Sequence, residues 1–139
     1  MEIPVVCNPQ VFTKDERTRH FDLAQEVLLR WPRSRDELPD GYLFSYEGDE
    51  ERFLTVARWA AADHRCCAWA SYAVEMGPFA NGRGALRMCV TGNAEGKAFL
   101  TAALRYVDEL AGAAPAEAIM NGKITRETIV DQLGTRCGR

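Results

Sequence analysis

Apolar and polar residues alternate over three stretches of this chain, at residues 42–46, 71–76 and 85–91. Alternation with a period of two is typical of β-strands, because successive side chains point to opposite faces of a sheet. Glycine, proline and asparagine residues lie between the second and third stretches and predict the turn of an antiparallel hairpin. A short apolar run at residues 3–7, which Pro9 limits, predicts one more strand.

Elsewhere, apolar residues recur at the three- and four-residue spacing of α-helices. Thr13 opens a capping box that predicts the start of a first helix, and Pro32 predicts its end. A second helix is predicted from about Asp49 to a pair of adjacent cysteines. Asn93 can cap a third helix, because its side chain is able to accept a hydrogen bond from the first helical turn.

The order of these elements predicts an α+β fold, a two-layer sandwich in which helices cover one face of a sheet. The predicted order is strand, helix, strand, helix, hairpin, helix, followed by a short C-terminal helix over residues 126–133 and a tail. We predict a single α+β domain over residues 1–115, with this short helix and tail over residues 116–139. Because the second face of the sheet needs water or a second copy to cover it, a homodimer is a further expectation.

The composition of the 139 residues is that of an ordinary globular domain, with 47% hydrophobic and 27% charged residues. The net charge of −3 arises from interspersed acidic and basic residues, without a lysine and arginine stripe to follow a nucleic-acid backbone. No apolar run approaches the roughly 20 residues that a membrane helix needs. We therefore expect a cytoplasmic protein whose partner is a metal ion or a small molecule, not nucleic acid or a membrane.

Cysteine is the residue type with the most chemical potential in this chain. The five cysteines are Cys7, Cys66, Cys67, Cys89 and Cys137. Their odd number, uneven spacing and lack of a C-x-x-C pair do not predict a disulfide framework or a zinc ribbon. The adjacent pair also makes a poor disulfide, because neighbouring Cα atoms are about 3.8 Å apart and bridged cysteines need roughly 4.4 to 6.8 Å.

The adjacent thiols of Cys66 and Cys67 favour a site for a soft metal. Thiolates prefer Zn(II), Cu(I), Hg(II) or As(III) to Mg(II) or Ca(II). Our first hypothesis is a protein that binds such a metal or metalloid through this vicinal pair, with His64, Cys89 or Cys137 as a possible third ligand. Both sulfurs of the pair can reach one ion only if the second helix ends about there, because neighbouring helical residues do not face each other.

Two other functions are compatible with the same residues. In the first, the protein is a thiol-dependent enzyme: one cysteine of the pair is a nucleophile or redox group, and Asp63 or His64 adjusts its protonation. Its substrate would be a small organic molecule held by aromatic side chains. In the second, the protein is an interaction or ligand-binding domain whose cysteines pack as small hydrophobic residues, since free cysteine is among the most buried residue types. The residues alone leave open whether any reaction is catalysed.

Three segments carry a resemblance to a known group of proteins. These are Glu-Leu-Pro-Asp-Gly-Tyr-Leu-Phe at residues 37–44, the helix that ends in Cys-Cys-Ala-Trp at residues 53–69, and Val-Thr-Gly-Asn-Ala-Glu-Gly within residues 86–96. In these segments the chain resembles small uncharacterised bacterial proteins with a Cys-Cys-Pro-Phe motif. The resemblance implies a helix that ends in the cysteine pair, a hairpin, and a helix opened by a Thr-Gly turn. Since some of these proteins accompany heavy-metal resistance genes, it also implies a heavy-metal response.

The chain departs from this motif next to the cysteine pair. Ala68 and Trp69 stand where the group has Pro and Phe, and either Asp63 or His64 stands where it favours a glutamate. The resemblance therefore supports the two adjacent cysteines as site residues and does not specify a third ligand.

Overall fold

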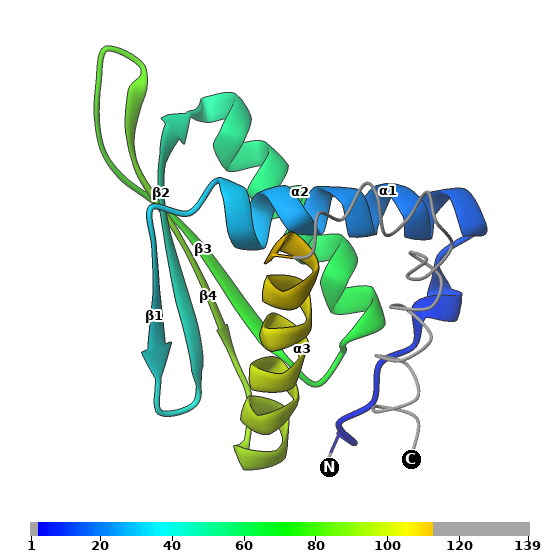
Figure 1. Ribbon diagram of the computed structural model, residues 1–139. Coiled ribbons are helices and arrows are strands. Elements are labelled where there is room, and N and C mark those ends of the chain that lie inside the picture. Colours follow the sequence, from blue (N-terminus) through cyan, green and yellow to red (C-terminus); the bar gives the residue numbers. More distant parts are fainter. Residues whose placement is uncertain (1–2, 113–139) are drawn as a thin grey trace.

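The computed structural model describes residues 3–112, which form a four-stranded antiparallel sheet with three helices on one of its faces (Figure 1). The strands lie in the order β1-β2-β4-β3. This arrangement confirms the predicted α+β class. In chain order the elements are the 3-10 turn η1 (Pro9–Val11), α1 (Lys14–Gln25), the π-helical turn η2 (Glu26–Arg30), β1 (Ser34–Leu38), β2 (Gly41–Asp49), α2 (Glu50–Cys66), β3 (Ser71–Ala80), β4 (Arg83–Thr91) and α3 (Ala94–Gly112).

The two central strands, β2 and β4, supply the sheet's part of the core. Phe44 of β2 pairs with Met88 of β4, and the two side chains are 1% and 0% exposed. Tyr46 and its partner Leu86 are buried on the same face. Because side chains alternate in direction along a strand, Cys89, the residue after Met88, lies on the opposite face of the sheet.

Each of the three helices begins at a residue whose side chain caps it. The sequence predicts the caps at Thr13 and Asn93, and for the second helix a start at about Asp49. Thr13 and Glu16 form the capping box of α1, with the Glu16 amide donating to the Thr13 hydroxyl at 3.2 Å. Asp49 accepts a hydrogen bond from the third amide of α2 at 2.9 Å. Asn93 accepts one from the third amide of α3 at 2.8 Å. Local polar side chains therefore fix where the helices start.

Residues 3–7 do not form the predicted strand. The segment runs past the end of α2, where the amide of Asn8 donates to the carbonyl of Cys66 at 2.9 Å. Within the apolar run Cys7 is buried, whereas Ile3 is 53% exposed. The segment therefore forms a backbone hydrogen bond with the end of α2 and not with a strand of the sheet. The first described elements are η1 and α1.

The first strand of the sheet is β1, which the sequence pattern did not predict. Its sequence, Ser-Arg-Asp-Glu-Leu, does not alternate, and four of its five residues are exposed. The backbone ladder with β2 holds it, from Ser34 opposite Ser45 to Leu38 opposite Gly41. An edge strand with charged side chains packs little against the core, so burial leaves no pattern in its sequence.

Some predictions fall on residues that the structure does not describe. The predicted helix at 126–133 and the predicted tail over 116–139 lie outside the described range, and the homodimer stays a prediction. Within residues 3–112, no helix combines the length and the apolar character that spanning a bilayer requires.

Candidate functional site

The two adjacent cysteines lie where α2 ends. Cys66 is the last helical residue, and Cys67 leaves the helix with φ −112° and ψ 69°. The Cys67 amide still donates to the carbonyl of Asp63 at 2.8 Å, while its own carbonyl accepts from the amide of Ala70 at 3.1 Å. The chain therefore bends directly after Cys66, which is the condition for both sulfurs to face one ion.

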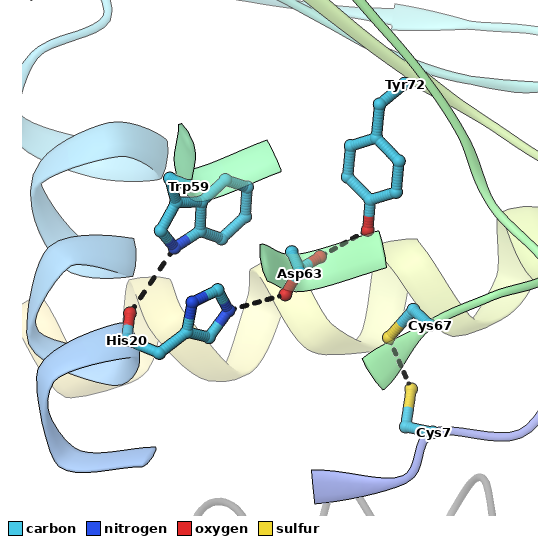
Figure 2. A network of polar contacts seen from close by, with 6 residues as sticks. All are labelled: Cys7, His20, Trp59, Asp63, Cys67 and Tyr72. Atoms are coloured by element: carbon cyan, nitrogen blue, oxygen red, sulfur yellow. Dashed lines mark hydrogen bonds and ion pairs between the residues drawn. The ribbon is translucent and has the colours of Figure 1, made fainter. Parts of the chain in front are cut away.

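A third sulfur completes this group, and it belongs to Cys7. The Sγ atoms of Cys7, Cys66 and Cys67 all lie within 4.8 Å of one another. Those of Cys7 and Cys67 are 2.7 Å apart (Figure 2). Both of these residues are 8% exposed, Cys66 is half-buried, and Val6 and Phe99 pack beside them. Three thiols thus meet within an apolar shell.

Contacts between the segment that follows Cys7 and the end of α2 hold the third sulfur in place. The amide of Asn8 donates to the carbonyl of Cys66 at 2.9 Å. Arg65 donates to a backbone carbonyl of η1 at 3.1 Å, and its guanidinium lies 5.3 Å from the centre of the Phe12 ring. Two consecutive residues at the end of α2 therefore position the segment that carries Cys7.

The pKa values of the two adjacent thiols are shifted in opposite directions. Hydrogen bonds with the thiols of Cys67 and Cys7 hold the pKa of Cys66 far below that of free cysteine. The opposite shift occurs at Cys67, where the hydrogen bond with Cys66 and burial raise the pKa. Of these two adjacent thiols, Cys66 is therefore the one that ionises more readily.

A second polar group lies beside the sulfurs and is centred on Asp63 of α2. Its Oδ1 atom is 2.9 Å from Nε2 of His20, and its Oδ2 atom accepts a hydrogen bond from the hydroxyl of Tyr72 (Figure 2). The His20 ring stacks on the indole of Trp59, with centroids 5.2 Å apart. Burial and the nearby carboxylate raise the pKa of Tyr72, so its hydroxyl stays protonated and able to donate.

A cavity of about 140 Å³ adjoins both groups. The three cysteines are among its lining residues, together with His20, Asp63 and Tyr72. The cavity continues between the sheet, α1 and α3, where its lining is mostly apolar and includes Ala24, Phe44, Leu100 and Ala103. The candidate site thus combines a thiol of lowered pKa, a hydrogen-bonded acid–imidazole–phenol group, and a space that a small apolar molecule can occupy.

The structure does not bring His64 or Cys89, two of the three predicted third ligands, to the cysteine pair. His64 is exposed, and the edge of its ring meets the Tyr72 ring at a centroid distance of 5.8 Å. Cys89 lies on the other face of the sheet, where burial and the carboxylates of Asp40 and Glu75 raise its pKa. Among the described residues, the sulfur group includes neither of them. Cys137 lies outside the described range.

Cys7, His20 and Tyr72 are residues of this site that the sequence pattern did not select. Cys7 stands 60 positions before Cys67, and only the fold brings the two sulfurs together. One local signal was available, because Asn8 and Pro9 follow Cys7 and an Asn-Pro pair is typical of a turn. That signal indicates a chain leaving a strand at Cys7, but it does not indicate where the chain goes.

Comparisons of the chain with protein-family models, with curated proteins and with solved structures found no match. The resemblance to proteins with a Cys-Cys-Pro-Phe motif therefore stays a prediction. The site itself is a group of three thiols beside an apolar cavity, and the functional argument rests on its geometry and chemistry.

Proposed function

We propose that the protein binds a soft metal or metalloid ion through the sulfurs of Cys7, Cys66 and Cys67. The observation that carries the proposal is the grouping of their three Sγ atoms within 4.8 Å of one another. Two sulfurs of a tetrahedral zinc site with bonds of about 2.3 Å lie about 3.8 Å apart. The three thiols are therefore close enough for one ion, provided that Cys7 and Cys67 separate from their contact at 2.7 Å.

The donor set favours a soft ion that accepts three ligands. Within residues 3–112, the group holds three cysteines and no carboxylate or imidazole. Thiolates select soft ions, and As(III) completes its valence with three bonds, whereas structural Zn(II) sites almost always have four ligands. A fourth ligand would have to come from solvent or from outside the described residues.

Charge also favours a trivalent metalloid over a divalent metal. Three thiolates and As(III) form a neutral complex, whereas three thiolates and Zn(II) or Hg(II) leave one negative charge. Cys7 and Cys67 are buried, and a net charge costs more in an apolar environment than in water. We therefore rank As(III) first among the candidate ions, ahead of Hg(II), Cu(I) and Zn(II).

Arsenite binding to the reduced full-length chain tests the proposal. Native mass spectrometry of anaerobically prepared protein should find one arsenic atom per chain. The Cys66→Ser/Cys67→Ser variant should bind none, and the matched Cys89→Ser variant should bind one. Equal arsenic content in the wild type and the double variant, with both folded by circular dichroism, contradicts the proposal.

Proton exchange distinguishes the two kinds of ion. If one of the three thiols is ionised beforehand, binding of Hg(II) to all three sulfurs releases about two protons per chain. Arsenous acid instead carries three hydroxyl groups that leave as water, so its binding takes up about one proton. Calorimetry in buffers with different ionisation enthalpies measures both numbers. Release of about three protons with Hg(II) would mean that Cys66 is not ionised in the free protein.

A second candidate function is a thiol-dependent reaction on a small organic substrate. The lowered pKa of Cys66 and the position of this residue at an apolar cavity favour it, because a thiolate beside a binding space can act as a nucleophile. A screen of reactive ester and disulfide probes at pH 6 tests this candidate. Modification of Cys66 no faster than that of free cysteine removes its basis.

A further inference from the structure

The cavity that adjoins the three thiols is larger than a bare ion requires. Its volume is about 140 Å³, and an ion held by three sulfurs would occupy the space among them. An apolar cavity of about 150 Å³ engineered into another protein stays free of water and binds benzene. The cavity of this protein therefore has the size of a single aromatic ring.

The polar side chains that line the cavity already have hydrogen-bond partners. Arg17, the one with a permanent charge among the basic lining residues, donates to the side-chain oxygen of Gln10 at 3.0 Å. Both carboxylate oxygens of Asp63 are engaged, one by His20 and the other by Tyr72. The hydroxyl of Tyr42, which also lines the cavity, lies 2.7 Å from the hydroxyl of Thr101. Since these groups already have partners, the cavity favours an apolar occupant over one that needs several new hydrogen bonds.

We propose that the physiological ligand of the three cysteines is an organic arsenic(III) compound with one apolar substituent of about the size of a phenyl ring. The arsenic atom binds two of the sulfurs, and the substituent occupies the cavity. This inference rests on the proposed function and specifies the class of ligand that the same site takes.

The binding reaction requires no oxidant or reductant. Phenylarsonous acid carries one phenyl group and two hydroxyl groups on arsenic. Two As–S bonds form and two As–O bonds break, and each departing hydroxyl leaves as water. The proton for one water comes from a thiol of the group, and the proton for the other comes from solvent if the second sulfur is the Cys66 thiolate. Arsenic stays trivalent, and the product is neutral, which suits burial.

Two substitutions on α3 separate the role of the cavity from that of the sulfurs. Ala103 lines the cavity, so Ala103→Leu places three additional carbon atoms where the substituent would lie. Ala102 is not among the lining residues, so Ala102→Leu is the matched control. We expect Ala103→Leu to weaken binding of phenylarsonous acid by tenfold or more and to change arsenite affinity less than twofold. The control variant should leave both affinities unchanged.

A series of ligands tests the same inference on the wild-type chain, in case Ala103→Leu fails to fold. Affinities of methyl-, phenyl- and biphenylarsonous acid are measured by competition with dithiothreitol, which corrects for the intrinsic affinity of each compound for thiols. Relative affinity should rise from methyl to phenyl and fall at biphenyl. A flat series, or equal losses of arsenite and phenylarsonous acid in Ala103→Leu, overturns the inference and leaves the proposed function intact. Failure of every arsenical to bind overturns both.

Discussion

Cys66 and Cys89 are both half-buried cysteines of one domain, yet their surroundings give their thiols opposite properties. At the end of α2, the thiols of Cys67 and Cys7 lower the pKa of Cys66. On the other face of the sheet, burial and nearby carboxylates raise the pKa of Cys89. Similar exposure therefore does not imply similar chemistry. Hydrogen-bond partners lower the pKa of Cys66, whereas burial and the charges of carboxylates raise that of Cys89.

The strongest test of this comparison removes one sulfur from each region. Cys7→Ser should weaken arsenite binding by on the order of 100-fold, or about 2.7 kcal/mol, because a hydroxyl oxygen is a poor ligand for a soft ion. Cys89→Ser should leave the affinity within twofold of the wild type. Competition against a small dithiol measures both values. Equal losses in the two variants would show that the grouping of the three sulfurs does not matter.

Alkylation at low pH tests the difference in protonation. At pH 6 the Cys66 thiolate should react with iodoacetamide at least about tenfold faster than Cys89, whose thiolate fraction is small below its raised pKa. The rate at Cys66 should stay nearly constant from pH 6 to 8, whereas the rate at Cys89 should rise with each pH step. Peptide mass spectrometry after a timed quench separates the two positions. Parallel pH profiles at Cys66 and Cys89 would contradict the difference in pKa.

Two tyrosine hydroxyls sharpen the comparison, because Tyr72 donates to Asp63 beside the sulfur group and Tyr42 bonds to other residues. Tyr72→Phe removes a hydrogen bond to the carboxylate of Asp63 and should lower the free energy of unfolding by about 1.5–3 kcal/mol. Tyr42→Phe removes a contact with the hydroxyl of Thr101 at 2.7 Å and a longer hydrogen bond, 3.2 Å, to the carboxylate of Glu37. Because the Glu37 side chain is 67% exposed and water can replace that bond, the substitution should cost only about 0.5–1.5 kcal/mol. Urea unfolding measures both changes. A smaller loss at Tyr72 than at Tyr42 would mean that water replaces the hydrogen bond to Asp63.

The smallest effect on the site is expected at the turn between β3 and β4, at the opposite end of β3 from the sulfur group. Gly82 has φ +76°, and a Cβ atom there would meet no atom within 4 Å. Gly82→Ala should therefore cost about 1 kcal/mol of stability through backbone strain alone. Arsenite affinity should not change. A change in affinity would reveal that the site depends on the overall stability of the fold.

The parts of the fold that were predictable are those that local chemistry determines. Thr13, Asp49 and Asn93 accept hydrogen bonds from the first turns of their helices, so the sequence alone indicates where these helices start. The hairpin of β3 and β4 was also predictable, because buried side chains alternate along β4. β1 was missed because its side chains are exposed and its place in the sheet depends on backbone pairing with β2.

The candidate site was predictable only in the part that lies within one segment. Cys66 and Cys67 are adjacent, and the end of α2 that brings their sulfurs together follows from the strand that begins at Ser71. Cys7 could not be assigned, because its place depends on hydrogen bonds between distant segments, such as that from Asn8 to Cys66. His64 lies three residues before Cys67, so the spacing favoured it over Cys7 as a third ligand. In the structure His64 is not part of the sulfur group.

The contact between Cys7 and Cys67 makes the protein sensitive to oxidation during purification. Two sulfurs 2.7 Å apart need to approach by less than an ångström to form a covalent bond of about 2.05 Å once air or peroxide is present. That single event removes two of the three donors. A sample handled without reductant would then be inert toward every arsenical, for a reason unrelated to its native affinity. Counting free thiols before each titration is therefore part of the measurement.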